Sequence, residues 1–201
     1  MIALVDYGAG NLWSIRNAFK RVGAGVELAV TPRELRDADA IVLPGVGNFG
    51  DAMSGIGKFK EMIVEKTSSG TPFIGLCLGI QVLMESSEES PESKGLGLFK
   101  GTCKKFPSEK QKVPHMGWNT VKIVKGTPLL DGVEDNSYFY FVHSYYVAPK
   151  DRSIAAGETD YCVKFPAVIS QKNIHATQFH PEKSSDAGLR IIENFVKMAR
   201  R

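Results

Sequence analysis

Residues 72–84 read PFIGLCLGIQVLM, and this stretch decides how the chain folds. Its first five residues predict a buried strand, and residues 80–85 predict a helix. Cys77 therefore stands at a turn from strand to helix, between Gly75 and Gly79, where a Cβ on either glycine would obstruct the turn. Because a helix N-terminus favours thiolate over thiol, we expect Cys77 to be a nucleophile rather than a buried structural cysteine.

Outward from this turn, the first half of the chain alternates strands with helices. Strands are expected at residues 2–5, 26–30, 40–43 and 72–76, with helices near 12–22 and 58–66. The second half is rich in strands, expected at 121–124, 138–142, 153–157, 168–170 and 176–179, and closes with a helix near 187–198. This pattern predicts one α/β domain over residues 1–201: an open, mostly parallel sheet flanked by helices, with an antiparallel extension in the second half.

A base for the cysteine is available in the segment QFHPE at residues 178–182. Pro181 biases His180 toward extended backbone angles, and in an extended chain His180 and Glu182 project to the same side. The carboxylate would accept from one ring nitrogen and leave the other nitrogen facing the thiol. Taken singly, His180 fits a partly buried structural histidine and Glu182 a solvated carboxylate; together with Cys77 they predict a Cys–His–Glu triad.

Gly45, Gly47 and Gly50 fit the spacing of a dinucleotide-binding loop, and they follow the strand at 40–43. That interpretation is disfavoured because Gly55 and Gly57 interrupt the helix that should follow the loop. The unit is also not the first strand–helix unit of the chain, where such a loop belongs.

Several motifs together resemble class I glutamine amidotransferases, which have a flavodoxin-like α/β fold. The two main motifs are GLCLGIQ at 75–81 and QFHPE at 178–182. Four further segments resemble the branch that forms the glutaminase subunit of imidazole glycerol phosphate synthase in histidine biosynthesis: PGVGNFG at 44–50, PHMGWN at 114–119, YFVHSY at 140–145 and HPEKS at 180–184. The resemblance implies hydrolysis of glutamine to glutamate and ammonia by the triad, without a cofactor.

The resemblance also implies roles for residues around the triad. The oxyanion hole would be formed by the backbone N–H of Leu78 and by the loop at Val46 and Gly47, and we expect the Val46 peptide to rotate before that hole is complete. The residues expected to contact glutamine are Gln81, His143, Ser144 and Tyr145, with His143 in a structural rather than a catalytic role.

A partner is expected because nothing in the chain resembles a synthase that could use the ammonia. The resemblance implies a heterodimer with a cyclase subunit, a (β/α)8 barrel that makes imidazole glycerol phosphate and an aminoimidazole carboxamide ribotide. Candidate interface residues are Asn11, Met116, Trp118, Tyr140 and Lys183. The alternative for Trp118 and Tyr140 is a place in the hydrophobic core.

Composition limits the other classes of function. A net charge of +3 is too small to indicate nucleic-acid binding, and the basic stretch 104–112 fits a solvated loop or, less well, a docking segment. The absence of a long apolar run argues against a membrane span, and the first residues fit a strand rather than a signal peptide. Three cysteines, with Cys103 and Cys162 interpreted as structural, favour the cytoplasm, and no spacing predicts a metal site.

Three other functions stay open at this point. The chain could be a glutaminase of the same class that serves pyridoxal phosphate synthesis, although the segment at 114–119 argues against it. It could be a cysteine hydrolase that acts on peptides or small amides. It could also be a binding or regulatory module without catalysis, which an intact Cys77, His180 and Glu182 disfavours.

Overall fold

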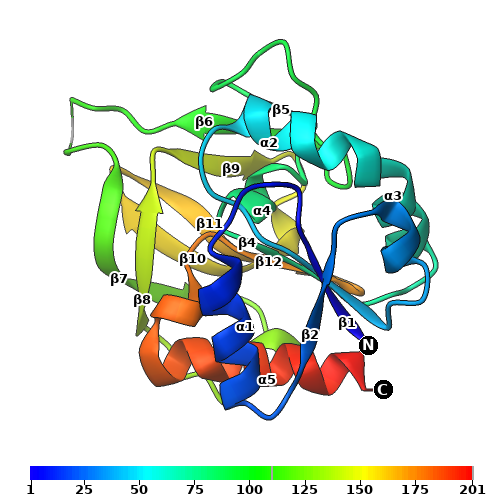
Figure 1. Cartoon of the computed structure of the whole chain (residues 1–201). Coiled ribbons are helices and arrows are strands. Elements are labelled where there is room, and N and C mark those ends of the chain that lie inside the picture. The colour runs from blue at the N-terminus through cyan, green and yellow to red at the C-terminus, as the bar shows by residue number, and fades with distance from the viewer. Residues whose placement is uncertain (110, 201) are drawn as a thin grey trace.

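The computed structural model describes residues 1–109 and 111–200. One nine-stranded sheet has the order β2-β1-β3-β4-β12-β11-β10-β7-β8, and a second sheet has the order β5-β6-β9 (Figure 1). The strands of the large sheet are β1 (Ile2–Val5), β2 (Val26–Ala29), β3 (Ala40–Leu43), β4 (Phe73–Leu76), β7 (His115–Ile123), β8 (Ser137–His143), β10 (Ala155–Tyr161), β11 (Val163–Gln171) and β12 (Ile174–Thr177). The small sheet contains β5 (Ser86–Ser87), β6 (Gly101–Lys105) and β9 (Tyr145–Pro149).

The helices are α1 (Leu12–Arg21), α2 (Phe49–Ile56), α3 (Lys60–Ser68), α4 (Leu78–Gln81) and α5 (Ser185–Ala199). Strands β2, β1, β3, β4 and β12 pair in parallel, and the pairs from β12 through β8 are antiparallel. This confirms the predicted parallel sheet with an antiparallel extension. Within the described ranges, no helix combines the length and apolar character needed to cross a bilayer.

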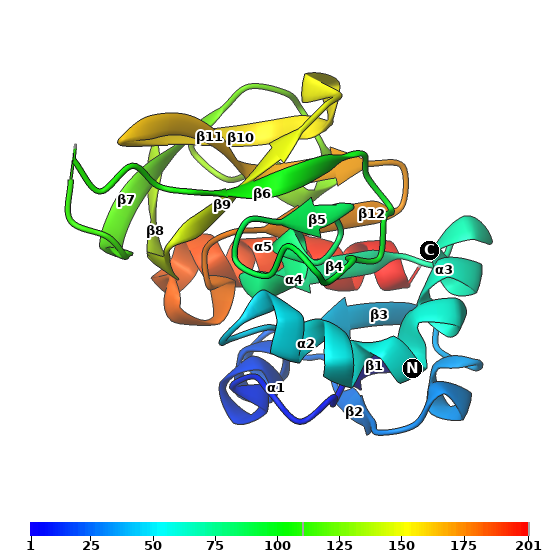
Figure 2. The ribbon, with the colours of Figure 1, turned by 90° about the horizontal axis from the view of Figure 1, so that it is seen from above.

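The parallel strands are buried on both faces, which explains their unbroken apolar sequences. Along β1, Ile2 and Leu4 join the hydrophobic cluster under α1 and α5, whereas Ala3 and Val5 join the cluster under α2 and α3. Figure 1 shows α2 and α3 on one side of the large sheet and α1 and α5 on the other, and Figure 2, seen from the side of α2, shows α5 behind the strands. Helices on both faces leave the carboxyl ends of the parallel strands as the open edge at which a ligand can bind.

Two helices differ from the sequence prediction. Helix α2 begins after Asn48, whose Oδ1 caps it by accepting from the Gly50 N–H at 2.8 Å. Gly55 does not interrupt this helix, contrary to the prediction, whereas Gly57 is the C-cap residue at which it ends. A Cβ on Gly55 would lie 2.6 Å from the Tyr7 carbonyl oxygen. Helix α4 stops at Gln81 instead of spanning 80–85, since the chain beyond it bonds to a later loop, with the Leu96 N–H 2.7 Å from the Val82 carbonyl oxygen.

The small sheet was not predicted. Strand β6 occupies the start of the basic stretch 104–112, so the expected loop is wrong for Lys104 and Lys105, while Lys110 lies outside the described residues. Strand β9 follows β8 after a single residue, and β7 begins at His115 rather than near residue 121. The other boundaries of the second half also shift: a 3-10 turn occupies 152–154 before β10, β11 extends over 163–171, and β12 ends at Thr177.

Candidate active site

The turn at Cys77 has the geometry that its glycines predict. Cys77 has φ 55° and ψ −108°, a conformation that is strained for a residue with a side chain, and its N–H donates to the Thr177 carbonyl oxygen at 2.8 Å. A Cβ on Gly75 would lie 2.6 Å from the Gly79 carbonyl oxygen, and one on Gly79 would lie 2.4 Å from the Leu43 carbonyl oxygen. The steric prediction for both glycines is confirmed.

His180 and Glu182 form a buried pair just beyond β12. The His180 Nδ1 and the Glu182 Oε1 are 2.8 Å apart, and the two side chains are 5% and 1% exposed. Because a carboxylate accepts, Nδ1 carries the proton. His180 is extended, as Pro181 predicts, but Glu182 lies in a 3-10 turn at Pro181–Lys183, so the expectation of an extended segment was wrong although the contact forms.

The other ring nitrogen of His180 is available to the thiol. Among the described residues, His180 Nε2 is buried without a hydrogen-bond partner, and His180 lines the same pocket as Cys77, whose Sγ lies 4.0 Å from the Val142 carbonyl oxygen. Burial lowers the pKa of His180, but the neighbouring Cys77 and Glu182 outweigh burial and raise it to about 10. His180 is therefore protonated at neutral pH.

A pocket of about 430 Å³ opens in front of Cys77. Its lining includes the residues predicted for the oxyanion hole and for glutamine binding: Val46, Gly47, Leu78, Gln81, His143, Ser144 and Tyr145. It also includes Glu89, Pro114 and Val142, which the sequence did not single out. Glu89 resembles the other residues of the polar stretch 85–94 in sequence, and it is distinguished only by its contact with the Phe49 N–H, which donates to its Oε2 at 2.7 Å.

The candidate oxyanion donors do not both face the pocket. The Leu78 N–H donates to the Gly45 carbonyl oxygen at 3.3 Å, so this carbonyl lies where a substrate oxyanion would have to bind. The Val46 N–H is on the opposite side of the same peptide bond and lies toward the buried Tyr7 hydroxyl. Burial and then the nearby Cys77 raise the pKa of Tyr7, and the Val46 N–H lowers it.

Gln81 lies one turn after Cys77 and its side chain is fixed. Its Nε2 donates to the Tyr145 carbonyl oxygen at 3.0 Å and lies 3.4 Å from the Gln178 Oε1. The helical spacing between Cys77 and Gln81 therefore places both on the pocket, as predicted.

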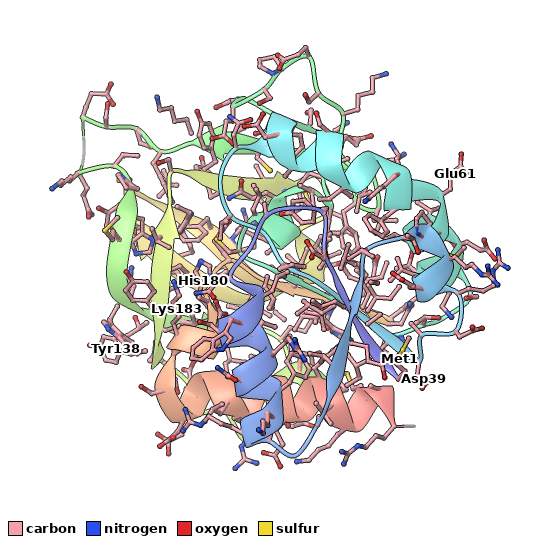
Figure 3. The ribbon with its side chains drawn as sticks, viewed as in Figure 1. Met1, Asp39, Glu61, Tyr138, His180 and Lys183 are labelled. Atoms are coloured by element: carbon pink, nitrogen blue, oxygen red, sulfur yellow. The ribbon has the colours of Figure 1, made fainter. Side chains whose placement is uncertain are left out.

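The candidate interface residues of β7 and β8 share one exposed face. Met116 is 63% and Trp118 51% exposed, so Trp118 is not a core residue. The rings of Trp118 and the half-buried Tyr140 lie 6.1 Å apart across the strand pair, and the Lys183 Nζ lies 6.0 Å from the Tyr140 ring centre. Tyr138, which was not predicted, adds a 63% exposed ring on the same strand, and Figure 3 shows it on the side of the molecule that carries Lys183 and His180.

Asn11 lies apart from these strands, in the exposed loop before α1, where its Oδ1 accepts from the Ser14 N–H at 3.2 Å. Helix α1 in turn lies against the turn Pro181–Lys183, which brings the loop to the same end of the molecule. Among residues 1–109 and 111–200, no three His, Cys, Asp or Glu side chains gather as metal ligands would.

Comparison with known proteins gives a consistent result. Residues 3–199 match the family Glutamine amidotransferase class-I. The chain is 52% identical over 198 residues to the imidazole glycerol phosphate synthase subunit HisH of Methanocaldococcus jannaschii, covering 98% of this chain and all of that protein. It is 51% identical over 200 residues to the HisH subunit of Methanothermobacter thermautotrophicus, covering both chains completely. The solved structure of PurLQS from Thermotoga maritima shares the fold, with a TM-score of 0.79 at 19% identity over 98% of this chain and 97% of that one.

Proposed function

The chain belongs to the class I glutamine amidotransferase family, as a HisH-type glutaminase subunit of imidazole glycerol phosphate synthase, and we propose that Cys77, His180 and Glu182 are its catalytic triad. The observation that carries this proposal is the buried His180–Glu182 pair, 2.8 Å apart, beside a cysteine held at a strained strand-to-helix turn. A structural cysteine would need neither the strained backbone nor a neighbouring histidine nitrogen that has no hydrogen-bond partner among residues 1–109 and 111–200.

Glutamine hydrolysis then proceeds in two stages. The Cys77 thiolate attacks the γ-carbonyl carbon of glutamine, forming a C–S bond and an oxyanion. The oxyanion collapses, the C–N bond breaks, and His180 gives its proton to the leaving nitrogen, which departs as ammonia. Water next attacks the γ-glutamyl thioester as His180 removes its proton, and the C–S bond breaks to give glutamate and the thiolate.

The electrostatics of His180 suit the first stage. Its raised pKa keeps the proton on the imidazole, so the general acid already carries its proton when glutamine binds. Glu182 holds the ring through Nδ1 and leaves Nε2 for the sulfur and the leaving nitrogen. Glu89 supplies a carboxylate to the pocket wall, where it suits the α-ammonium group of the amino-acid substrate.

The oxyanion hole forms only after a change in the loop after β3. The Gly45 carbonyl must leave the Leu78 N–H, and rotation of the Gly45–Val46 peptide would bring the Val46 N–H to the pocket in its place. Gly47 has φ +92°, in a region that glycine adopts without strain, and the Val46 side chain is 41% exposed. The rotation therefore disrupts few packing contacts. Before the rotation the subunit hydrolyses glutamine slowly.

The exposed apolar face of β7 and β8 is the surface that binds the cyclase subunit. Met116, Trp118 and Tyr138 are large, exposed side chains at one edge of the sheet, and they lie near the triad turn that carries Lys183. A cyclase subunit with a (β/α)8-barrel fold covers this face in a heterodimer and receives ammonia from the pocket. This assembly operates in the cytoplasm.

Partner binding should therefore activate the glutaminase. Ammonia release from glutamine, measured for the chain alone and with its cyclase subunit and that subunit's ligand, is expected to rise by at least about tenfold in the complex. Equal rates with and without the partner would contradict the proposed rotation, and no ammonia release in the complex would contradict the proposed function.

Trp118→Ala provides the matched test of the surface. Removing this ring is expected to weaken the complex by about 30-fold in Kd, as loss of a central aromatic anchor does. Leu28→Ala is the control, because Leu28 is also exposed but lies on β2 at the opposite edge of the sheet. Equal effects of the two substitutions, measured by titration calorimetry, would place the interface elsewhere.

A further inference from the structure

A series of four hydrogen-bonded polar groups, two of them buried histidines, runs from β7 to the wall of the glutamine pocket. The Asn119 Nδ2 lies 3.2 Å from the His115 Nε2, and the His115 Nδ1 lies 3.0 Å from the His143 Nε2. The His143 Nδ1 in turn lies 2.8 Å from the Tyr145 carbonyl oxygen. The triad does not use these two histidines, and both are buried.

The position of every proton along this chain follows from its two ends. A carbonyl only accepts, so the His143 Nδ1 must carry a proton; its bare Nε2 then accepts from the His115 Nδ1. The bare His115 Nε2 accepts from Asn119. The Asn119 amide cannot turn over, because its Nδ2 also donates to the Asp160 carbonyl oxygen at 3.1 Å and its Oδ1 accepts from the Thr120 N–H at 2.8 Å.

Both histidines are therefore neutral, and a proton added to either would place two donors face to face. Burial lowers the pKa of His115 to about 4 and that of His143 to about 3, which agrees with the neutral state at pH 7. Aromatic rings hold His115 in place: its ring stacks on Phe141 at 4.7 Å and on Tyr161 at 4.0 Å, measured between ring centres.

The chain ends on a carbonyl that also belongs to the active site. The Tyr145 oxygen accepts from His143 and from the Gln81 Nε2, which uses both of its lone pairs. Gln81 and Tyr145 both line the pocket, and Gln81 lies one helical turn from Cys77. If His143 changed its tautomer, its bare Nδ1 would face the carbonyl, and the strand that carries Tyr145 would have to move away.

We propose that Asn119 and His115 are positioning residues for the glutaminase site: through His143 they fix the Tyr145 carbonyl and, with it, the Gln81 side chain. The inference rests on the proposed function, since it assigns these residues a role in glutamine binding. Neither residue touches the substrate. Their effect should therefore appear mainly in the KM for glutamine rather than in the turnover of bound glutamine.

Two substitutions of His115 separate hydrogen bonding from packing. His115→Phe keeps a flat ring between Phe141 and Tyr161 but removes the donor to His143 and the acceptor for Asn119. His115→Gln loses the ring, but its amide can donate to His143 and accept from Asn119 as the imidazole does. If His115 acts only by packing, His115→Phe should impair the enzyme less than His115→Gln. If it acts through its hydrogen bonds, His115→Gln should impair the enzyme less.

The experiment measures glutamine KM and kcat of the complex, together with the imidazole ¹⁵N shifts of His143 in the chain. We expect His115→Phe to raise KM by about tenfold with kcat within about twofold, and to lose the single Nδ1–H tautomer. His115→Gln should keep KM within about twofold and retain that tautomer. An unchanged KM in the folded Phe variant, or a KM raised as much by Gln as by Phe, would overturn the proposal.

Loss of the proposed activity and loss of the hydrogen-bond series give different experimental results. If the wild-type complex releases no ammonia from glutamine, the proposed function is wrong. The ¹⁵N shifts then still decide the hydrogen-bond chain, because they do not require activity. An unprotonated Nδ1 on His143 in the wild-type protein would contradict the proposed series of hydrogen bonds, whether or not the enzyme is active.

Discussion

Replacing Cys77 by alanine is expected to reduce glutamine-dependent ammonia release in the complex by about 10⁴-fold or more, the scale of losing the nucleophile of a triad. The sulfur forms the bond to the γ-carbon, and alanine has no atom that could form it. Binding should survive, because the pocket wall at Gln81, Tyr145 and Glu89 is untouched. The measurement is a coupled assay of glutamate formation with the cyclase subunit present.

Cys162→Ser is the control for Cys77→Ala, because Cys162 lies at the turn between β10 and β11 and is not part of the pocket lining. The control should keep its activity within about twofold. A Cys77→Ala complex that retained even a tenth of wild-type activity would show that the nucleophile lies elsewhere.

Gly79→Ala is expected to cost about 3 kcal/mol or more of unfolding free energy, because a rigid backbone oxygen occupies the space of the new methyl group. The Cβ would lie 2.4 Å from the Leu43 carbonyl oxygen, so α4 and the end of β3 must move apart. At about 2–4 °C per kcal/mol for a chain of this size, the melting temperature should fall by roughly 10 °C. The same shift separates Cys77 from the oxyanion loop, so activity should fall as well.

Gly57→Ala is the matched control for Gly79→Ala. Gly57 has φ −49° and ψ −41°, and no atom of the part of the chain that the structure describes lies within 4 Å of the Cβ it would gain. Its replacement should leave the melting temperature unchanged or raise it slightly, because alanine restricts the unfolded chain. Equal melting temperatures for the two variants would contradict the packing described at the turn.

The parallel half of the fold could be predicted from the sequence because its strands are buried on both faces. Unbroken apolar runs such as residues 40–43 and 72–76 have few other interpretations. The small sheet could not be predicted, because the charged Lys104 and Lys105 are residue types that are common in solvated loops. They end strand β6, whose backbone groups form hydrogen bonds with β9. Helix α2 was missed because its glycines argue against a helix locally, while the contact of Gly55 with Tyr7 is tertiary.

The candidate site divides in the same way. Cys77, His180 and Glu182 could be predicted because their chemistry and spacing are local to short segments. The exposed Tyr138 and the pocket residue Glu89 could not, since their roles depend on which strands pair and which loops fold over the pocket. The hydrogen-bond chain through His115 depends on the register that places it opposite His143, which no pattern in the sequence reveals.

Alkylation with a glutamine analogue that carries a diazoketone in place of the carboxamide tests whether Cys77 is the nucleophile of a glutaminase. The complex is treated with the analogue, residual activity is followed, and the modified residue is located by peptide mass spectrometry. We predict that activity is lost in step with alkylation of Cys77, one label per chain, and that glutamine protects. Inactivation with Cys77 unlabelled, or labelling of Cys103 or Cys162 in its place, would contradict the account.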